Sequence, residues 1–382
     1  MTRTALVIGG TGPTGPHIVE GLVERGYQLT LLHGGMHEVP FTVALHEHLH
    51  ADPHFGESLS ACLGDRTFDL VVATYGRLGV VAQHFRGRTG RLIGIGSGTG
   101  TAAHAGDPRW GLLGRPHNLR EDWNIRESAD GPDGLSRRMA AVEVALLQAG
   151  ADGAYDATYL GYTSIYGPRQ PAPFDWCVVR RLLDGRSRLV IADGGLKVEL
   201  RLYSENAARA VLCAVDRPEA TRGRSFYLAD ERQFTMRQRI EAIAAHLGRP
   251  VELVDLPYPL ARPCHPFWRH EREHRYRDTR LAQLALGYRD AVTPAAALAR
   301  TLEWLLANPP ERGGEVEGKL GDSFDYDAED RLLAEVDRAV SGLAGISYDL
   351  PPEVHQYRHP TAPGEVWKGP PPQGAPLSGA ST

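Results

Sequence analysis

The sequence predicts an α/β protein with a doubly wound parallel sheet, on three observations. Short apolar runs rich in β-branched residues alternate with stretches whose apolar residues recur at helical spacing. The apolar runs are continuous, which is typical of strands buried on both faces of a sheet. The first run leads at once into a glycine-rich turn and an amphipathic stretch. Together these patterns indicate βαβ units with helices on both faces of the sheet.

The first half of the chain supplies most of the expected sheet. Strands are expected at 5–8, 29–32, 68–73 and 91–95, with a further strand that ends at 50–52, and helices at 17–25 and 56–63. The alternation continues with a helix at 136–148, a strand at 154–162 and a helix at 175–184. The sheet therefore extends to about residue 170.

Beyond residue 170 the alternation is less regular. Short strands are expected at 188–192, 198–202, 225–229 and 251–256, and helices at 235–247, 294–306 and 327–340. Ser204 is expected to cap a further helix at its N-terminus, because its side-chain oxygen can accept a backbone N–H of the first turn. From Pro351 onward the chain is rich in proline, and its end has the composition of a disordered tail.

Composition and charge narrow the class of protein. The 382 residues carry a formal charge of −5, from 42 Lys and Arg against 47 Asp and Glu, which lacks the basic excess of a general nucleic-acid binder. No apolar run approaches the roughly 18 residues of a membrane span, and the first strand begins too early to leave room for a signal peptide. The four cysteines have no metal-ligand spacing. We therefore expect a cytoplasmic protein with reduced thiols.

The strongest local signal is the glycine loop after the first strand. Gly9, Gly12 and Gly15 follow the G-x-x-G-x-x-G spacing. The first glycine allows a tight turn, the second lets the backbone approach a pyrophosphate, and the third lets the helix pack closely on the strand. The helix N-terminus adds backbone N–H groups and a positive dipole end. The spacing predicts a Rossmann-type dinucleotide site whose loop residues are Gly9, Thr11, Gly12, Pro13, Thr14 and Gly15.

The end of the second strand bears on the choice between NAD and NADP. An Asp or Glu there would favour NAD, but the chain reads Leu31-Leu32-His33-Gly34-Gly35. The missing acid favours NADP, although the Arg that would meet its 2′-phosphate is missing as well. His33 either contacts that phosphate or closes the strand.

These residues, with further motifs, resemble the extended short-chain dehydrogenase/reductase superfamily, in its NAD-dependent epimerase/dehydratase branch. Asp52 is similar to the family's adenine-contacting Asp, and Thr74, Tyr75 and Gly76 lie where family members line the cofactor. Tyr166-Gly-Pro-Arg-Gln170 matches a family signature at the nicotinamide end. The segment 201–208 resembles the family's segment that begins with Arg and ends in D-x-A, with Asn206 at the usual Asp position.

The resemblance implies a domain plan and an assembly. It implies an NAD(P)-binding Rossmann core over residues 1–170, to which segments near 195–230 contribute, and a smaller α/β substrate domain over 171–345. Residues 346–382 would form a C-terminal extension. It further implies a homodimer.

The chain departs from this family at the catalytic pair. Family members use Tyr-x-x-x-Lys on the helix before the sixth strand, where the Lys lowers the pKa of the Tyr that transfers the proton. Here Leu135 and Met139 take those places. No register recovers the pair, because there is no Tyr between residues 75 and 155 and no Lys before Lys197. The residues that could replace it near the strand ends are Ser97, Thr99, His104, Tyr162 and Tyr166.

Two H-E-x-x-H strings, at 46–50 and 270–274, have the spacing of zinc ligands on a helix. The first leads into a strand, and the second lies among arginines that would oppose a bound cation. We therefore assign no metal ligand from the sequence.

Three functions follow, in order of preference. The first is an NAD(P)-binding epimerase, dehydratase, reductase or non-redox isomerase or cyclase that works by a variant mechanism. The second is a non-catalytic, dinucleotide-sensing regulatory protein. The third is a metalloenzyme that uses the histidine strings.

Overall fold

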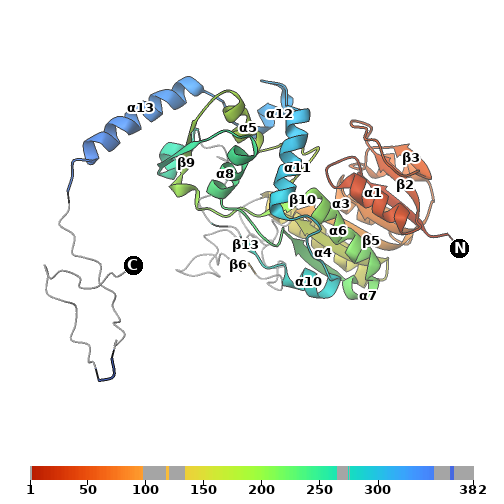
Figure 1. Ribbon diagram of the computed structural model, residues 1–382. Coiled ribbons are helices and arrows are strands. Elements are labelled where there is room, and N and C mark those ends of the chain that lie inside the picture. The colour runs from red at the N-terminus through yellow and green to blue at the C-terminus, as the bar shows by residue number, and fades with distance from the viewer. Residues whose placement is uncertain are drawn as a thin grey trace. The chain divides into compact units, whose positions relative to one another are not determined.

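The computed structural model describes residues 2–97, 118–119, 134–264, 274, 276–347 and 362–364 (Figure 1). The chain divides into two compact units, Met1–Asp325 and Tyr326–Thr382. The second unit contains helix α13, Tyr326–Leu343. The domain boundaries expected near residues 170 and 345 stay a prediction, and the expected disordered tail lies outside the described residues.

The first unit is built on a seven-stranded sheet in which every neighbouring pair of strands is parallel. Its strands are β1 (Thr4–Ile8), β2 (Gln28–His33), β3 (Glu47–His50), β4 (Phe68–Ala73), β5 (Thr89–Ser97), β7 (Asp156–Tyr162) and β11 (Arg224–Leu228). Their order across the sheet is β11-β7-β5-β4-β1-β2-β3. Strands β1 to β3 are thus added toward one edge of the sheet, and strands from β4 onward toward the other. This switch between β1 and β4 is where an open α/β sheet forms a ligand crevice at its carboxyl edge.

Helices cover both faces of this sheet, which confirms the predicted fold class (Figure 1). Helices α1 (Gly15–Glu24) and α6 (Ser204–Asp216) bury side chains such as Ile18 and Val211 against one face. Helices α2 (Gly56–Leu63), α3 (Leu78–His84) and α4 (Gly134–Ala151) pack on the other, where Leu146 meets the strands. Successive residues of β1 alternate between these two cores, so the strand must be apolar throughout.

A separate apolar core lies within the same unit. It is formed by helices α5 (Trp176–Leu183), α8 (Met236–His246) and α11 (Pro294–Ala307) with strand β9 (Arg188–Ala192). Strand β9 pairs in parallel with β12 (Glu252–Leu256), and β8 (Ser164–Tyr166) pairs with β10 (Arg201–Tyr203). The remaining elements are β6 (Asn118–Leu119), the short 3₁₀ helix η4 (Asp193–Gly195), α7 (Pro218–Thr221), α9 (Tyr258–Ala261), β13 (Tyr276–Arg277), α10 (Arg280–Leu286) and α12 (Glu315–Leu320).

Two local expectations need correction. Strand β3 ends at His50, so Asp52 follows the strand instead of closing it. The Asp52 carboxylate accepts a backbone N–H from His54, which makes a turn there. Ser204 is the first residue of α6, and Tyr203 holds the cap position without a side-chain cap.

Among the helices that the structure describes, none combines the length and the apolar character that a membrane crossing would need.

Candidate dinucleotide site

The glycine loop lies at the carboxyl end of β1, next to β4, at the reversal point of the sheet. A Cβ on Gly9 would lie 2.2 Å from Thr74 Oγ1, and one on Gly15 would lie 2.1 Å from the backbone of Gly10. Both positions therefore admit only glycine. The glycine at position 9 lets the loop pass against the end of β4. The glycine at position 15 lets α1 begin directly against the loop.

Gly12 is different, because a Cβ there would meet nothing within 4 Å. Within the described part of the chain, the backbone N–H groups of Thr11 and Gly12 have no protein acceptor. Open space beside unpaired N–H groups at a helix N-terminus fits a pyrophosphate. The loop that the sequence predicts for the cofactor thus has the steric pattern that the cofactor requires.

Thr74, Tyr75 and Gly76 follow β4 and lie against the glycine loop. The Thr74 hydroxyl donates to Ile8 O at 3.0 Å and accepts the Gly10 N–H at 3.3 Å. This double contact fixes the loop to the end of β4. Tyr75 is 56% exposed and its ring packs edge-on against His54. An exposed aromatic ring beside the crevice is available to stack on a planar ligand.

His33 and Asp52 lie at the edge of the sheet that β2 and β3 form. His33 is buried, and burial lowers the pKa of its imidazole. Its Nε2 lies 3.6 Å from the Glu38 carboxylate and 2.5 Å from His48 Nε2. Asp52 is exposed and pairs with His54 Nδ1 at 2.7 Å. Backbone and side-chain hydrogen bonds from His54 lower the pKa of Asp52.

At the expected nicotinamide end, the two proposed tyrosines are not available to a substrate. The Tyr162 hydroxyl donates to Ala207 O at 3.1 Å inside the core, and burial raises its pKa. The Tyr166 hydroxyl donates to Asp230 Oδ2 at 2.8 Å, and burial raises its pKa as well. Both side chains lack access to the crevice, which argues against the catalytic roles expected for them. Ser97 ends β5, whereas Thr99 and His104 lie outside the described residues.

Tyr159 is a residue that the sequence analysis overlooked. Its hydroxyl donates to Ser97 O at 3.0 Å, and it reaches this carbonyl only because residue 96 is glycine, whose Cβ would lie 2.3 Å from the hydroxyl. Burial raises the pKa of Tyr159, so this hydroxyl is a donor and not a base. Tyr159 therefore positions the end of β5. The sequence feature that could have indicated this contact is a tyrosine in β7 next to the two glycines, Gly94 and Gly96, of β5.

The helix expected to carry the catalytic pair is α4. Glu143, the acid used to register it, is buried and accepts hydrogen bonds from Tyr227 at 2.8 Å and from Ser225 at 2.5 Å. This carboxylate therefore joins α4 to β11.

In the first H-E-x-x-H string, the two outer histidines have different partners. His46 contacts Gln28, whereas His50 pairs with Glu38 at 3.0 Å. In the second string, His274 Nδ1 accepts the Val198 N–H at 3.3 Å, and His270 lies outside the described residues.

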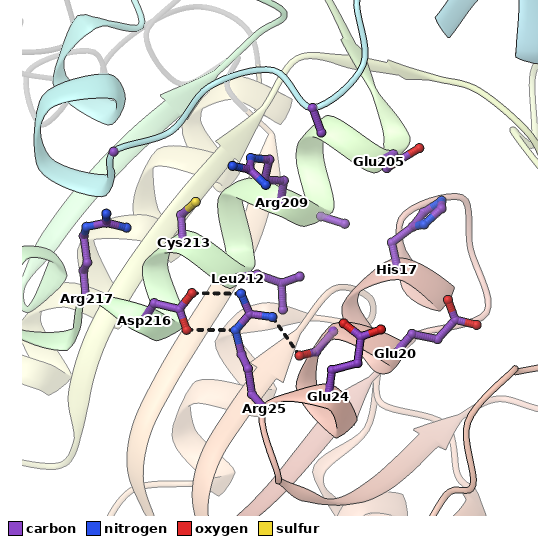
Figure 2. Close-up of a pocket in the computed structure, with 14 residues that line it drawn as sticks. His17, Glu20, Glu24, Arg25, Glu205, Arg209, Leu212, Cys213, Asp216 and Arg217 are labelled. Atoms are coloured by element: carbon purple, nitrogen blue, oxygen red, sulfur yellow. Dashed lines mark hydrogen bonds and ion pairs between the residues drawn. The ribbon is translucent and has the colours of Figure 1, made fainter.

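A separate hollow of about 460 Å³ lies between helices α1 and α6 and the segment around Gly287 and Ala291 (Figure 2). Arg25 crosses it, pairing with Asp216 at 2.8 Å and donating to Gly21 O at 2.8 Å. None of the residues predicted for the cofactor lines this hollow. Its groups tie α1 to α6, and it is distinct from the dinucleotide crevice.

No family model matches the chain, and no curated protein matches it in sequence. Solved structures match in fold. The UDP-glucose 4-epimerase of Thermotoga maritima, determined with UDP-glucose, has a TM-score of 0.61 at 17% identity and covers 81% of this chain and 100% of its own. The dTDP-glucose 4,6-dehydratase of Streptomyces venezuelae with NAD bound has a TM-score of 0.61 at 17% identity and covers 80% and 98%.

The UDP-glucuronic acid 4-epimerase of Bacillus cereus, in complex with UDP-glucuronic acid and NAD, is similar over the same extent. Its TM-score is 0.58 at 16% identity, with 80% of this chain and 99% of that chain covered. These likenesses extend well past the seven-stranded sheet, since they take in four fifths of the chain. The chain therefore has the fold that these epimerase and dehydratase structures share.

Proposed function

We propose that the protein is an enzyme that binds a nicotinamide dinucleotide and acts on a small molecule by a variant of the epimerase/dehydratase mechanism. One observation supports a bound dinucleotide. A Cβ at Gly9 or Gly15 would clash with neighbouring atoms, whereas Gly12 faces open space beside unpaired N–H groups at the start of α1. Thr11 and Gly12 would hold the pyrophosphate, and Thr74, Tyr75 and Gly76 would line the crevice beside it. The bound nicotinamide would supply hydride transfer.

The variant mechanism rests on the sequence of α4 and on the two buried tyrosines. Helix α4 contains neither Tyr nor Lys, and the hydroxyls of Tyr162 and Tyr166 are held in the core. In this proposal the proton would move through groups at the end of β5 and in the segment after it. Ser97, Thr99 and His104 stay our proposals for these groups, with Tyr159 positioning Ser97.

The identity of the dinucleotide is a finer question. The absence of an acid directly after β2 favours NADP, as the sequence predicts. The Glu38 carboxylate, 3.6 Å from His33, would repel a 2′-phosphate and favours NAD. Titration of the protein with NAD⁺, NADH, NADP⁺ and NADPH measures both the binding and the preference.

The decisive variant is Gly12→Ala. Its methyl group meets nothing in the protein but fills the pyrophosphate space, so we expect at least about tenfold weaker dinucleotide binding with unchanged folding. Gly318→Ala in α12 is the matched control, because a Cβ there also meets nothing within 4 Å. If the wild type binds none of the four dinucleotides in calorimetry, the proposed function fails.

The second candidate function is a non-catalytic dinucleotide sensor, which the buried state of Tyr162 and Tyr166 favours. The two functions differ in whether the bound nicotinamide changes redox state. The dinucleotide-loaded protein should be incubated with UDP- and dTDP-linked sugars, the ligand class of the structures similar in fold, while nicotinamide absorbance and sugar products are followed. Turnover supports the enzyme, and tight binding without any redox change or product supports the sensor.

A further inference from the structure

Three histidines and one glutamate converge at the sheet edge formed by β2 and β3. His33 ends β2, His48 and His50 lie on β3, and Glu38 comes from the segment that joins these strands. One nitrogen from each imidazole and one carboxylate oxygen all lie within 4.8 Å of one another. Imidazole and carboxylate are the ligands that zinc accepts besides thiolate.

The strand register explains why the three rings meet. His33 is the direct partner of His50 across the parallel pair, and His48 lies two residues earlier on the same face as His50. The centroids of the His33, His48 and His50 rings are 4.8 to 4.9 Å apart in all three pairings. The rings therefore surround one point, which Glu38 closes from the loop.

We propose that His33, Glu38, His48 and His50 form a four-coordinate zinc site. Donor atoms in a tetrahedral site with Zn–N bonds of about 2.0–2.1 Å are about 3.3–3.4 Å apart. Glu38 Oε1 lies 3.6 Å from His33 Nε2 and 3.0 Å from His50 Nε2, which bracket this value, and Glu38 Oε2 lies 3.8 Å from His48 Nε2. The His33–His48 separation of 2.5 Å must widen as the ion enters.

Charge and burial favour a cation over an anion at this point. In the described residues, the ion pairs of Glu38 are with these three histidines and involve no Arg or Lys. Its carboxylate would repel a phosphate, whereas it completes the ligand set of a divalent ion. The His33 side chain is 3% exposed and the other three are 32–57% exposed, so the site has a rigid inner ligand and an entry path from solvent.

One existing contact has to change. The Gly35 N–H donates to His33 Nδ1 at 3.1 Å, so in the metal-free protein this ring carries its proton on Nε2. Zinc on Nε2 moves the proton to Nδ1, and the peptide before Gly35 must turn its carbonyl toward that proton. Gly34 and Gly35 are adjacent, and a Cβ on Gly34 would meet nothing within 4 Å, so the loop has room for this turn.

A closed four-ligand site of this kind is structural, since it leaves no coordination position for a substrate. Its effect would be to fasten residues 34–46 to the sheet edge beside the crevice. Met36 in this segment is 84% exposed and lies two residues before Glu38, so its accessibility reports on the fastening. Two of its ligands, His33 and Glu38, also lie where the ribose of the proposed dinucleotide would bind, but zinc binding can be measured without dinucleotide.

The test is zinc binding by protein without a polyhistidine tag, measured by competition with a chromophoric chelator and by metal analysis after dialysis. We expect one zinc per chain. His48→Ala, His50→Ala and Glu38→Gln should each weaken binding by more than about 100-fold, because losing even an outer-shell partner costs about 10–100-fold. Zinc should also slow proteolysis of the 34–46 segment and raise the melting temperature.

His46→Ala is the matched control, because His46 is an exposed histidine next to the same strand but contacts Gln28 and not the cluster. It should bind zinc as the wild type does. Circular dichroism shows whether each variant is folded, and the three exposed-ligand variants test the site even if a His33 variant fails to fold. The proposal is overturned if the wild type binds no stoichiometric zinc, or if binding survives His48→Ala and His50→Ala. A dinucleotide titration of the same samples keeps this outcome separate from that of the proposed function.

Discussion

Asn206 shows how one residue can decide the chemistry of a buried network. It stands at the Asp position of the family segment that residues 201–208 resemble, and its amide satisfies four contacts at once. Its Nδ2 donates to Asp230 Oδ1 and to Val292 O at 3.0 Å, and its Oδ1 accepts the N–H groups of Ala291 and Val292. Asp230 also accepts from Tyr166, so the network joins α6 to the segments that follow β8 and β11.

Asn206→Asp should therefore destabilise the protein. The new carboxylate would face Asp230 without the two donors that Nδ2 now supplies, in a site where both residues are buried. We expect a loss of about 2–4 kcal/mol in the free energy of unfolding, measured by urea denaturation. Asn308→Asp, at an exposed asparagine, is the control and should change stability by less than about 1 kcal/mol. A neutral effect at Asn206 would show that the network is not the reason for the amide.

Single residues were predicted well only where their role follows from the local chain. The glycine loop is a local pattern, and its steric contacts agree with the expected spacing. His33, Glu38, His48 and His50 were not grouped, because their meeting depends on the register between β2 and β3. The H-E-x-x-H pattern instead coupled His46 with His50, which is a helical spacing on a segment that forms a strand. The burial of Tyr162 and Tyr166 could not be predicted, because the depth of a side chain is a tertiary property.

At the scale of elements, apolar periodicity was a reliable guide. Strands β1, β4 and β7 begin and end within two residues of the expected positions, because each is a mainly apolar run in which most residues are buried. The bounds of short strands in polar sequence were harder to predict. The expected strand at 198–202 is β10 at Arg201–Tyr203, while Val198 forms only an isolated bridge to Thr235.

Helices α5 and α8 are joined by a buried ion pair that no local pattern indicated. Arg239 donates to both oxygens of Asp175 at 2.6 and 2.7 Å and lies over the Tyr166 ring at 4.6 Å. Both side chains are at most 6% exposed. Burial by itself raises the pKa of Asp175, but the Arg239 guanidinium outweighs it and the net shift is downward.

Removal of one partner of this pair should be costly. Arg239→Met leaves the Asp175 carboxylate buried without a counter-ion, and we expect a loss of about 3–5 kcal/mol in the free energy of unfolding. The double variant Arg239→Met with Asp175→Leu removes both charges and should recover part of that loss. Chemical denaturation of the two single variants and the double variant gives the coupling. Strictly additive effects would mean that the ion pair does not join the helices energetically.

At the scale of the whole molecule, the order of the strands follows from simple rules. Successive strands of the sheet are neighbours except β3 and β4, whose connection returns past β2 and β1, and the apolar strands near the start lie at the centre of the sheet. The reversal between β1 and β4 then creates the crevice at which the glycine loop lies. What the sequence did not predict is the second apolar core around α5, α8 and α11, because the pairing of β9 with β12 joins segments about 60 residues apart.

The pH dependence of global stability provides the last prediction, through Asp290. Burial is the main cause that raises the pKa of Asp290 from 3.8 to about 6. The hydrogen bond from Tyr288 opposes this shift, and the Asp230 charge reinforces it. Between these values the folded chain holds a proton that the unfolded chain releases, so this stabilisation is complete below pH 4 and is lost as the pH rises through about 6. The carboxyl is partly exposed, so we expect a loss of about 1–2 kcal/mol in the free energy of unfolding from pH 4.5 to 7.5.

Asp290→Asn should remove this slope in urea denaturation series, whereas Asp65→Asn, at a fully exposed side chain, should retain it. An unchanged slope in Asp290→Asn would assign the pH dependence to other carboxyl groups. Asp175 and Asp216 are separable from it, because their lowered pKa values place their loss of stability on the acid side of pH 4.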